Sequence, residues 1–275
     1  FLGWRADTPV HAHNAHDADP DCVYTNTILG IANLSLERLD APMRAAPYLE
    51  AARSNIGRAT EYERMFLDAA EAWARGDGVE TITGFEAIGE RYPSDLVSVK
   101  IAQFHHFMRG NSYGLLRCSN RAADACPDDP FALGLVSFGY VECNRFEEAE
   151  ESARKAIDGM RNEVWAHHNL AHVMEMQGRF EEGADWLNGF TDTWGDCNRE
   201  FRSHMAWHHS LYYTAMGDTD KALDLFDNKI WGPDTEWGND KDLTRFPLHA
   251  VGLLWRLSLE GVDVGDRWKT VANQI

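Results

Sequence analysis

Five short segments with a glycine or an asparagine at their centre recur along the chain at an almost constant spacing. The central residues are Gly76, Gly110, Asn144, Gly178 and Gly217, of which the first four follow one another every 34 residues and the last follows after 39. Glycine and asparagine tolerate the left-handed backbone conformation that ends a helix and opens a tight turn. The spacing therefore predicts a helix, a turn and a second helix, repeated with a period of about 34 residues.

This period is typical of tetratricopeptide repeats (TPR). Apolar residues recur mostly at intervals of three and four, and no alternating apolar run bounded by turn residues predicts a strand. Because one helix pair cannot bury its apolar faces alone, neighbouring pairs stack into a right-handed solenoid with a concave inner surface. We expect an all-α, TPR-like α-solenoid of stacked antiparallel helix pairs with a C-terminal capping helix.

The predicted helix pairs organise the whole chain as a single superhelical domain, residues 1–275. Residues 1–19 contribute the second helix of a truncated repeat, and Pro20 separates it from the next helix at about 22–37. Helix pairs are expected at about 60–92, 96–126, 130–159, 163–193 and 201–228. Residues 229–247 lack the period and read as a long loop of the kind that often forms a lid. Residues 248–275 are expected to form the capping helix and tail.

Charge and cysteine usage limit the classes of partner. Lysine and arginine number 26 against 44 aspartates and glutamates, so the net charge of −18 repels nucleic acids and anionic membranes. The five cysteines include no CxxC pair, and neither a membrane-spanning run nor a signal peptide is evident. We expect a cytoplasmic protein with reduced thiols that binds neither nucleic acid nor membrane, and a homo-oligomer stays open.

Two histidine pairs at helical spacing lie on consecutive predicted helices. His168 precedes His172 by four residues, and His204 precedes His208 by four, so each pair presents both imidazoles on one helix face. Glu175 follows His172 by three residues and joins that face. These five residues are the candidate catalytic residues, either with a histidine as general base oriented by Glu175 or with the pairs holding a metal that activates water.

Alignment on the turn residues places other side chains on the same inner face. Its N-terminal half is aromatic and its C-terminal half is rich in histidine. The candidate ligand-binding residues on this face are Trp73, Phe104, Phe138, Trp207, Glu63 and Lys100. Such a mixture of aromatic and polar groups is typical of a binding surface for an organic ligand.

Three interpretations of the histidines remain open. Packed imidazoles can serve structure alone by bonding to carbonyls and carboxylates. They can form the polar wall of an organic-ligand pocket. They can also ligate zinc or iron, since His-x-x-x-His spacing suits these metals, although the first pair lacks the glutamate that a zinc metalloprotease helix places directly after its first histidine. The sequence identifies no cofactor, and we assign no metal ligand.

Several motifs resemble the family of tetratricopeptide repeat protein 38. The run from Ala166 to Gly178 matches that family's A-x-H-x-x-A-H-x-x-E-M-x-G helix, and His204, Trp207, His208, Leu211 and Tyr212 match the next helix. The tail from Leu254 to Trp268 is similar to the family's L-W-R-L…G-V-x-V-G-x-R-W end. The resemblance implies TPR-like helical pairs and no settled reaction.

The chain departs from that family at two positions. Family members tend to carry histidine where this chain has Asn26, and aspartate where it has His249. If the family's histidine and aspartate belong to one site, this chain binds a different ligand or performs different chemistry there. Asn26 and His249 therefore join the candidate ligand-binding residues.

We expect the inner face to bind a small organic molecule or a short peptide in a pocket lined by histidine, tryptophan and glutamate. The first alternative is an enzyme that uses the same residues for acid–base or metal-assisted chemistry. The second alternative is a protein-interaction scaffold, the commonest use of TPR repeats. An inner face with more histidine and tryptophan than the lysine, arginine and asparagine that clamp peptide carboxylates weighs against the scaffold.

Overall fold

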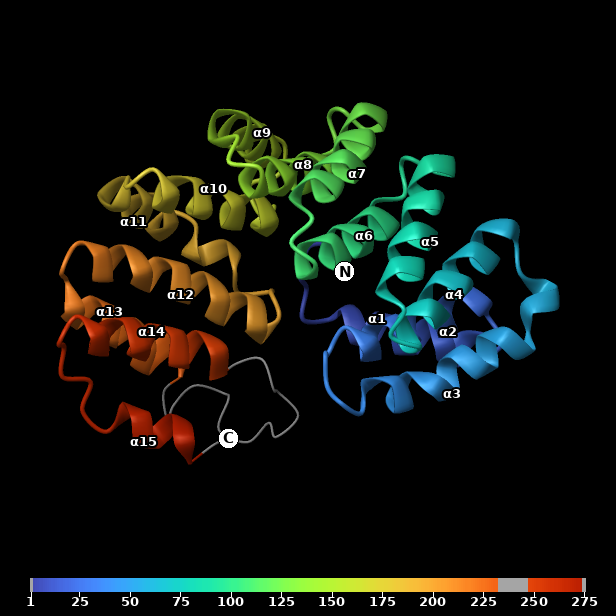
Figure 1. Ribbon diagram of the computed structural model, residues 1–275, viewed down its shortest axis with the longest axis horizontal. Coiled ribbons are helices and arrows are strands. Elements are labelled where there is room, and N and C mark those ends of the chain that lie inside the picture. The colour runs from blue at the N-terminus through green and yellow to red at the C-terminus, as the bar shows by residue number, and fades with distance from the viewer. Residues whose placement is uncertain (1, 232–246, 274–275) are drawn as a thin grey trace. The chain divides into compact units, whose positions relative to one another are not determined.

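Helices are the regular elements of the computed structural model, which describes residues 2–231 and 247–273 (Figure 1). The contacts divide the chain into two compact units, Phe1–Ala166 and His167–Ile275. The all-α prediction is confirmed. The single superhelical domain expected from the repeat stays a prediction.

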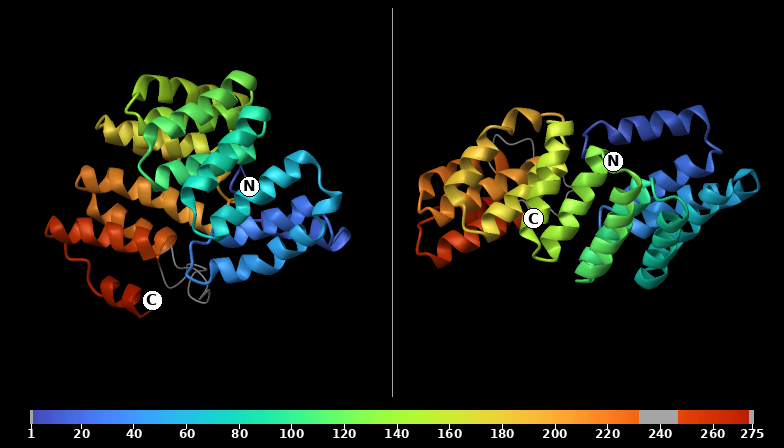
Figure 2. Two further views of the ribbon diagram at one scale, coloured as in Figure 1. Left: turned by 45° about the vertical axis from the view of Figure 1, so that its right-hand side comes forward. Right: turned by 90° about the horizontal axis from the view of Figure 1, so that it is seen from above.

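Nine helices of the described residues lie wholly within the first unit. They are α1 (Thr8–Ala18), α2 (Val23–Leu34), α3 (Ala41–Ser54), α4 (Glu61–Ala74), α5 (Gly78–Arg91), α6 (Leu96–Met108), α7 (Ser112–Ala125), α8 (Pro130–Glu142) and α9 (Phe146–Gly159), with a short 3-10 helix at Ile56–Arg58. The helices α4 and α5, α6 and α7, and α8 and α9 pack in pairs, side by side in both views of Figure 2. These three pairs confirm the predicted repeats over 60–159.

The boundary between the units falls within α10 (Val164–Met176). The second unit continues with α11 (Phe180–Asn188), α12 (Arg199–Ala215), α13 (Thr219–Leu225), α14 (Pro247–Leu259) and α15 (Arg267–Ala272), with short helical turns at Thr191–Thr193 and Phe226–Ile230. Among the described helices, none combines the length and the apolar character needed to cross a membrane.

The turn residues of the repeat adopt the backbone conformation that the sequence predicts. The φ angles are 76° at Gly76, 65° at Gly110, 72° at Gly178 and 75° at Gly217, and Asn144 takes the same left-handed region with φ of 57°. This conformation ends the first helix of each pair, and only glycine adopts it without a steric cost from Cβ. The 34-residue spacing therefore fixes where each pair turns.

Small residues let paired helices approach closely. A Cβ on Gly84 of α5 would lie 2.7 Å from Cβ of Ala69 on α4. The rings of Phe66 and Phe85 fill the same layer, edge to face with centroids 5.5 Å apart, and both are fully buried. The pairing of α4 with α5 thus depends on alternating small and large side chains, as close packing of helices requires.

The sequence analysis missed α3. This helix packs closely against α2. A Cβ built on Gly30 of α2 would lie 2.6 Å from Cδ2 of Leu49 on α3. A glycine or asparagine does not mark the turn before it, since the left-handed residue there is Glu37, with φ of 52°. Pro42 stands in the first turn, where proline is tolerated, but Pro47 stands inside the helix, a position at which proline normally argues against a helix.

The predicted capping helix is present as α14. Its Leu253, Leu254 and Leu257 are fully buried and belong to one core cluster with Phe226 and Ile230. The predicted long loop over 229–247 begins differently, because Lys229 and Ile230 complete a π-helical turn. The rest of that loop, residues 232–246, lies outside the described residues.

We expect Gly178→Ala to lower the free energy of unfolding by about 1–2 kcal/mol, because the Cβ of alanine is strained in the left-handed backbone conformation at this position. Gly57 provides a matched control. Neither site has an atom within 4 Å of a built Cβ, and only Gly178 has a positive φ. Gly57→Ala should leave stability unchanged or raise it by up to about 1 kcal/mol. Urea denaturation measures both, and equal effects would contradict the assigned turn.

Candidate functional site

The four histidines of the two predicted pairs meet at their Nε2 atoms. Nε2 of His168 on α10 lies 3.1 Å from Nε2 of His172 and 3.0 Å from Nε2 of His204 on α12. Nε2 of His204 lies 3.1 Å from Nε2 of His208. One ring nitrogen of each residue lies within 4.8 Å of those of the other three. We call these residues the four-histidine cluster.

The other ring nitrogens of the cluster face polar groups. Nδ1 of His168 is 3.2 Å from Oδ1 of Asn169, and Nδ1 of His204 is 2.9 Å from Nε2 of His249 on α14. Nδ1 of His208 lies 3.5 Å from Oε2 of Glu175. His249 and Glu175 therefore belong to the same site as the cluster.

Burial keeps the cluster uncharged near neutral pH. His168 and His208 are buried and His172 and His204 are partly buried. Burial, and then the neighbouring imidazoles, lower the pKa of His168, His204 and His208 well below 6.5. A neutral imidazole carries one N–H and one nitrogen lone pair, so each ring can donate a hydrogen bond and still ligate a cation.

The pKa of the Glu175 carboxyl group is shifted in the opposite direction from those of the imidazoles. Burial raises its pKa, and the attractions of His172 and of Arg256 partly oppose this shift. Burial also lowers the pKa of His249 to about 4. The site therefore combines neutral imidazoles with one partly exposed acid.

Aromatic and cationic side chains close the cluster on one side. The Trp207 ring stacks on His204 with an interplanar angle of 18° and centroids 5.7 Å apart, and the Arg256 guanidinium lies 5.4 Å from the centroid of the Trp207 ring. The imidazoles touch one another, so the space between their nitrogens admits an ion and not an organic molecule. The organic-ligand pocket expected at these side chains finds no support.

The other aromatic candidates, Trp73, Phe104 and Phe138, lie in the first unit. Trp73 packs against Phe104, with centroids 5.9 Å apart, and edge-on against His105 at 4.4 Å. Phe138 packs edge-on against Trp165 at 4.9 Å. These rings are part of the packing between first helices of successive pairs, with Trp73 and Phe138 partly or wholly covered.

Lys100 contacts the N-terminal segment of the chain. Its Nζ donates a hydrogen bond to the main-chain carbonyl of Leu2 at 3.0 Å. The ammonium group also lies 4.4 Å from the centroid of Trp4 and 5.2 Å from that of Trp165, and these two rings are 5.5 Å apart. Residues 2–4 therefore lie against α6 and the start of α10, covered by aromatic and cationic groups.

A buried acid accompanies Lys100. Glu163, just before α10, is 1% exposed, and its carboxylate accepts a hydrogen bond from the backbone N–H of Ala166. Gly134 makes room for it, because a Cβ there would lie 2.7 Å from Oε2 of Glu163. Burial lowers the pKa of Lys100 and raises that of Glu163, and their mutual attraction opposes both shifts. Two oppositely charged groups are therefore buried near each other in the first unit.

The last two candidates serve helix ends. Glu63 completes a capping box, in which its carboxylate accepts from the backbone N–H of Thr60 at 2.7 Å. Asn26 is buried on α2 and donates from Nδ2 to the carbonyls of Pro20 and Cys22, at 2.7 and 2.9 Å. Both side chains hold local structure at these positions.

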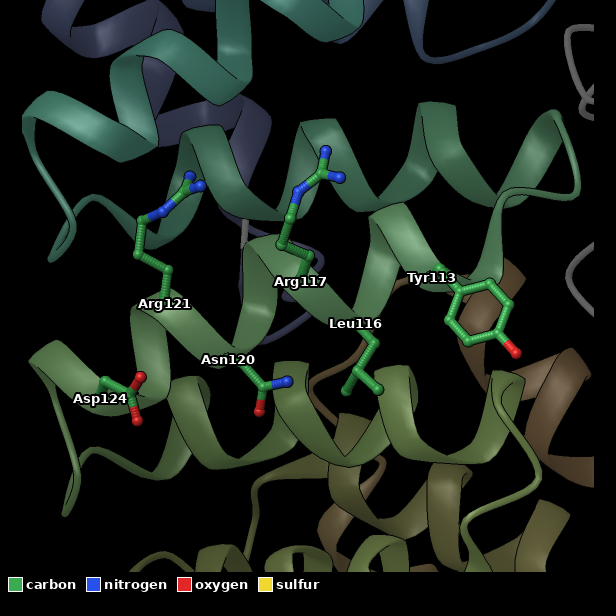
Figure 3. Close-up of a pocket in the computed structure, with 6 residues that line it drawn as sticks. All are labelled: Tyr113, Leu116, Arg117, Asn120, Arg121 and Asp124. Carbon is green, nitrogen blue, oxygen red and sulfur yellow. The ribbon is translucent and has the colours of Figure 1, made fainter.

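A shallow, open pocket lies on α7, away from every candidate residue. Figure 3 shows its six lining residues, Tyr113, Leu116, Arg117, Asn120, Arg121 and Asp124, with the two arginines pointing to one side of the helix. Arg117 pairs with Glu86 at 2.6 Å and Arg121 with Glu90 at 3.2 Å, so both arginines tie α7 to α5. These ion pairs give the pocket a structural explanation.

Sequence reasoning missed Trp4, Trp165 and Glu163. Trp4 precedes the first predicted turn, and no period extends to it. Trp165 and Glu163 stand at the start of the helix that carries His168 and His172, and only those histidines suggested a site there. The two tryptophans are the available signal, because tryptophan is a common anchor of binding surfaces.

The hydroxyl of Tyr212 joins the two helices that carry the four-histidine cluster. This residue of α12 is 1% exposed and donates to the carbonyl of Ala171 on α10 at 2.7 Å. We expect Tyr212→Phe to lower the free energy of unfolding by about 1 kcal/mol. The neighbouring Tyr213→Phe, which loses a solvent-exposed contact with Asn188, should change it by less than about 0.5 kcal/mol. Chemical denaturation measures the free energy of unfolding of both variants. Equal values would contradict a stabilising hydrogen bond between Tyr212 and Ala171.

Comparison with protein-family models gives no match for the chain. Among solved structures of similar fold, a thermophilic TPR protein from Thermus thermophilus has a TM-score of 0.54 and 16% identity, covering 72% of this chain and 99% of the other. A tetratricopeptide repeat protein from Parabacteroides merdae has a TM-score of 0.54 and 14% identity, covering 91% and 99%. At these identities the likeness shows the fold alone. The chain is an all-α, TPR-like solenoid.

Proposed function

We propose that this chain is a TPR-like binding protein. Its first unit recognises a short peptide segment that carries an aromatic side chain. The motifs quoted above also support membership of the tetratricopeptide repeat protein 38 family. Peptide binding combines part of the leading sequence interpretation with the scaffold alternative, and moves the binding surface from the histidines to the surroundings of Lys100.

The observation that carries the proposal is the placement of residues 2–4 of the chain itself. Lys100 holds the carbonyl of Leu2, and the Trp4 ring lies against both Lys100 and Trp165. Gly3 passes beside Phe131, whose ring is 3.7 Å from a Cβ built on that glycine. This segment makes the two kinds of contact by which proteins bind peptides, a main-chain hydrogen bond and an aromatic anchor.

We call Lys100, Phe131 and Trp165 the Trp4-binding surface. Its chemistry specifies a ligand. The ammonium group attracts the face of an aromatic ring and a carbonyl oxygen at once, and the Trp165 ring adds apolar contact. A peptide with a tryptophan two residues after a free carbonyl group satisfies both.

The chain's own segment would compete with such a ligand. A tethered segment has an effective concentration of about 1 mM, so a free peptide must exceed this to displace it. Removal of the Trp4 ring should therefore expose the surface without altering the residues that form it.

The test uses a fluorescein-labelled peptide of sequence Leu-Gly-Trp-Arg-Ala-Asp, which repeats residues 2–7. We expect Trp4→Ala protein to bind it about 10-fold more tightly than the unmodified chain, as measured by fluorescence polarisation. Replacing the peptide's tryptophan by alanine should weaken binding about 30-fold, the effect of an anchor residue worth about 2 kcal/mol.

Two further variants complete the design. Trp4→Ala/Lys100→Met removes the cation while keeping a long apolar side chain, and should lose the gain in affinity. Trp255→Ala removes a tryptophan of α14 that is 60% exposed and should bind the peptide like the unmodified chain. If Trp4→Ala binds no peptide, or if Lys100→Met leaves binding intact, peptide recognition at this surface is wrong.

The cysteines support a cellular setting for this function. All five lie within the described residues, and none forms a disulfide: Cys22, Cys118, Cys126, Cys143 and Cys197. Burial raises the pKa of the Cys118 thiol to about 12, so this residue stays protonated and unreactive. Cysteines that are not joined in disulfides favour a reducing compartment such as the cytoplasm.

A further inference from the structure

The contacts within the four-histidine cluster exceed what hydrogen bonding can satisfy. Three Nε2–Nε2 contacts of 3.0–3.1 Å share four nitrogens, and Nε2 of His168 and of His204 each take part in two. A ring nitrogen has either one hydrogen or one lone pair, so each forms one good hydrogen bond. At most two of the three contacts are then bonds, and the third brings together two nitrogens already used.

We propose that the four-histidine cluster binds one divalent transition-metal ion, zinc being the ion that its ligands fit best. An ion that accepts one lone pair from each of the four rings would satisfy all four nitrogen atoms, which hydrogen bonding does not. Imidazole suits zinc, copper, iron and nickel, and four ligands match the tetrahedral preference of zinc. At zinc–nitrogen distances of about 2.0–2.1 Å, tetrahedral ligands stand roughly 3.3 Å apart. Three of the six nitrogen–nitrogen distances here are 3.0–3.1 Å, and all four nitrogens lie within 4.8 Å of one another, so binding requires the rings to shift toward equal spacing.

The surroundings support ligation through Nε2. Metal-bound histidines usually donate the other ring N–H to a carboxylate, carbonyl or similar acceptor, which fixes the tautomer. Nδ1 faces Oδ1 of Asn169 at His168, Nε2 of His249 at His204, and the Glu175 carboxylate at His208. The contacts of His168 and His204 orient these two rings with Nε2 left for the ion, whereas Nδ1 of His208 lies at an ion-pair distance of 3.5 Å from the Glu175 carboxylate without a hydrogen bond.

The number of ligands indicates what the metal does. Catalytic zinc keeps a position for water, whereas structural zinc has four protein ligands. All four positions here come from α10 and α12, so the ion would link these two helices and stabilise the second unit. The metal-assisted enzyme alternative, which needs a water ligand, gains nothing from such a closed set.

The first measurement is metal content by mass spectrometry of the untagged full chain after dialysis, with cobalt titration followed by visible absorbance as a second probe. We expect one equivalent of bound metal and the intense spectrum of tetrahedral cobalt. In His168→Ala/His204→Ala both should disappear. Glu175→Gln keeps all four ligands and should weaken zinc affinity roughly 10- to 100-fold in competition with a chromogenic chelator.

His209→Ala is the matched control. It removes a buried histidine of α12, 4% exposed, that takes no part in the cluster, so metal content should stay at one equivalent. Chelation should lower the Tm of the unmodified chain and of His209→Ala, but not that of the double variant. If the double variant fails to fold, the zinc affinity of Glu175→Gln relative to the unmodified chain provides the test instead. Absence of zinc and cobalt binding in the unmodified chain, or equal binding by the double variant, would overturn the proposal.

Discussion

Burial of each helix against its neighbours in the stack is the constraint on which the other features depend. A TPR helix cannot cover its apolar face within its own pair, so the first helices of successive pairs lie side by side. Trp73 of α4 and Phe104 of α6 fill one such contact, and Tyr212 joins α12 to α10 in another. The histidines of α10 and α12 meet because these helices must pack, whatever chemistry the imidazoles perform.

Burial also sets the electrostatics of both polar centres. In the second unit it keeps imidazoles neutral, which leaves lone pairs available close together. In the first unit it encloses Lys100 and Glu163, and their mutual attraction opposes the effect of burial on the pKa of each.

The two centres suggest a division of work within one chain. The Trp4-binding surface belongs to the first unit and provides contacts suited to a peptide. The four-histidine cluster belongs to the second unit and provides a closed ligand set suited to a structural ion. Neither requires the other, so a metal-free chain is compatible with peptide binding, and a chain that binds no peptide is compatible with metal binding.

The sequence by itself determined the helical class, the 34-residue repeat, the turns at Gly76, Gly110, Asn144 and Gly178, and the shared face within each histidine pair. These follow from local backbone geometry and helical periodicity, which a single chain displays directly. It did not show α3, because Glu37 takes the left-handed turn position there. Only the tertiary structure decided that the two pairs face each other through Nε2 and that His249 joins them. It also decided that residues 2–4 lie on Lys100, since contacts between distant segments depend on helix packing and side-chain rotamers that local sequence does not encode.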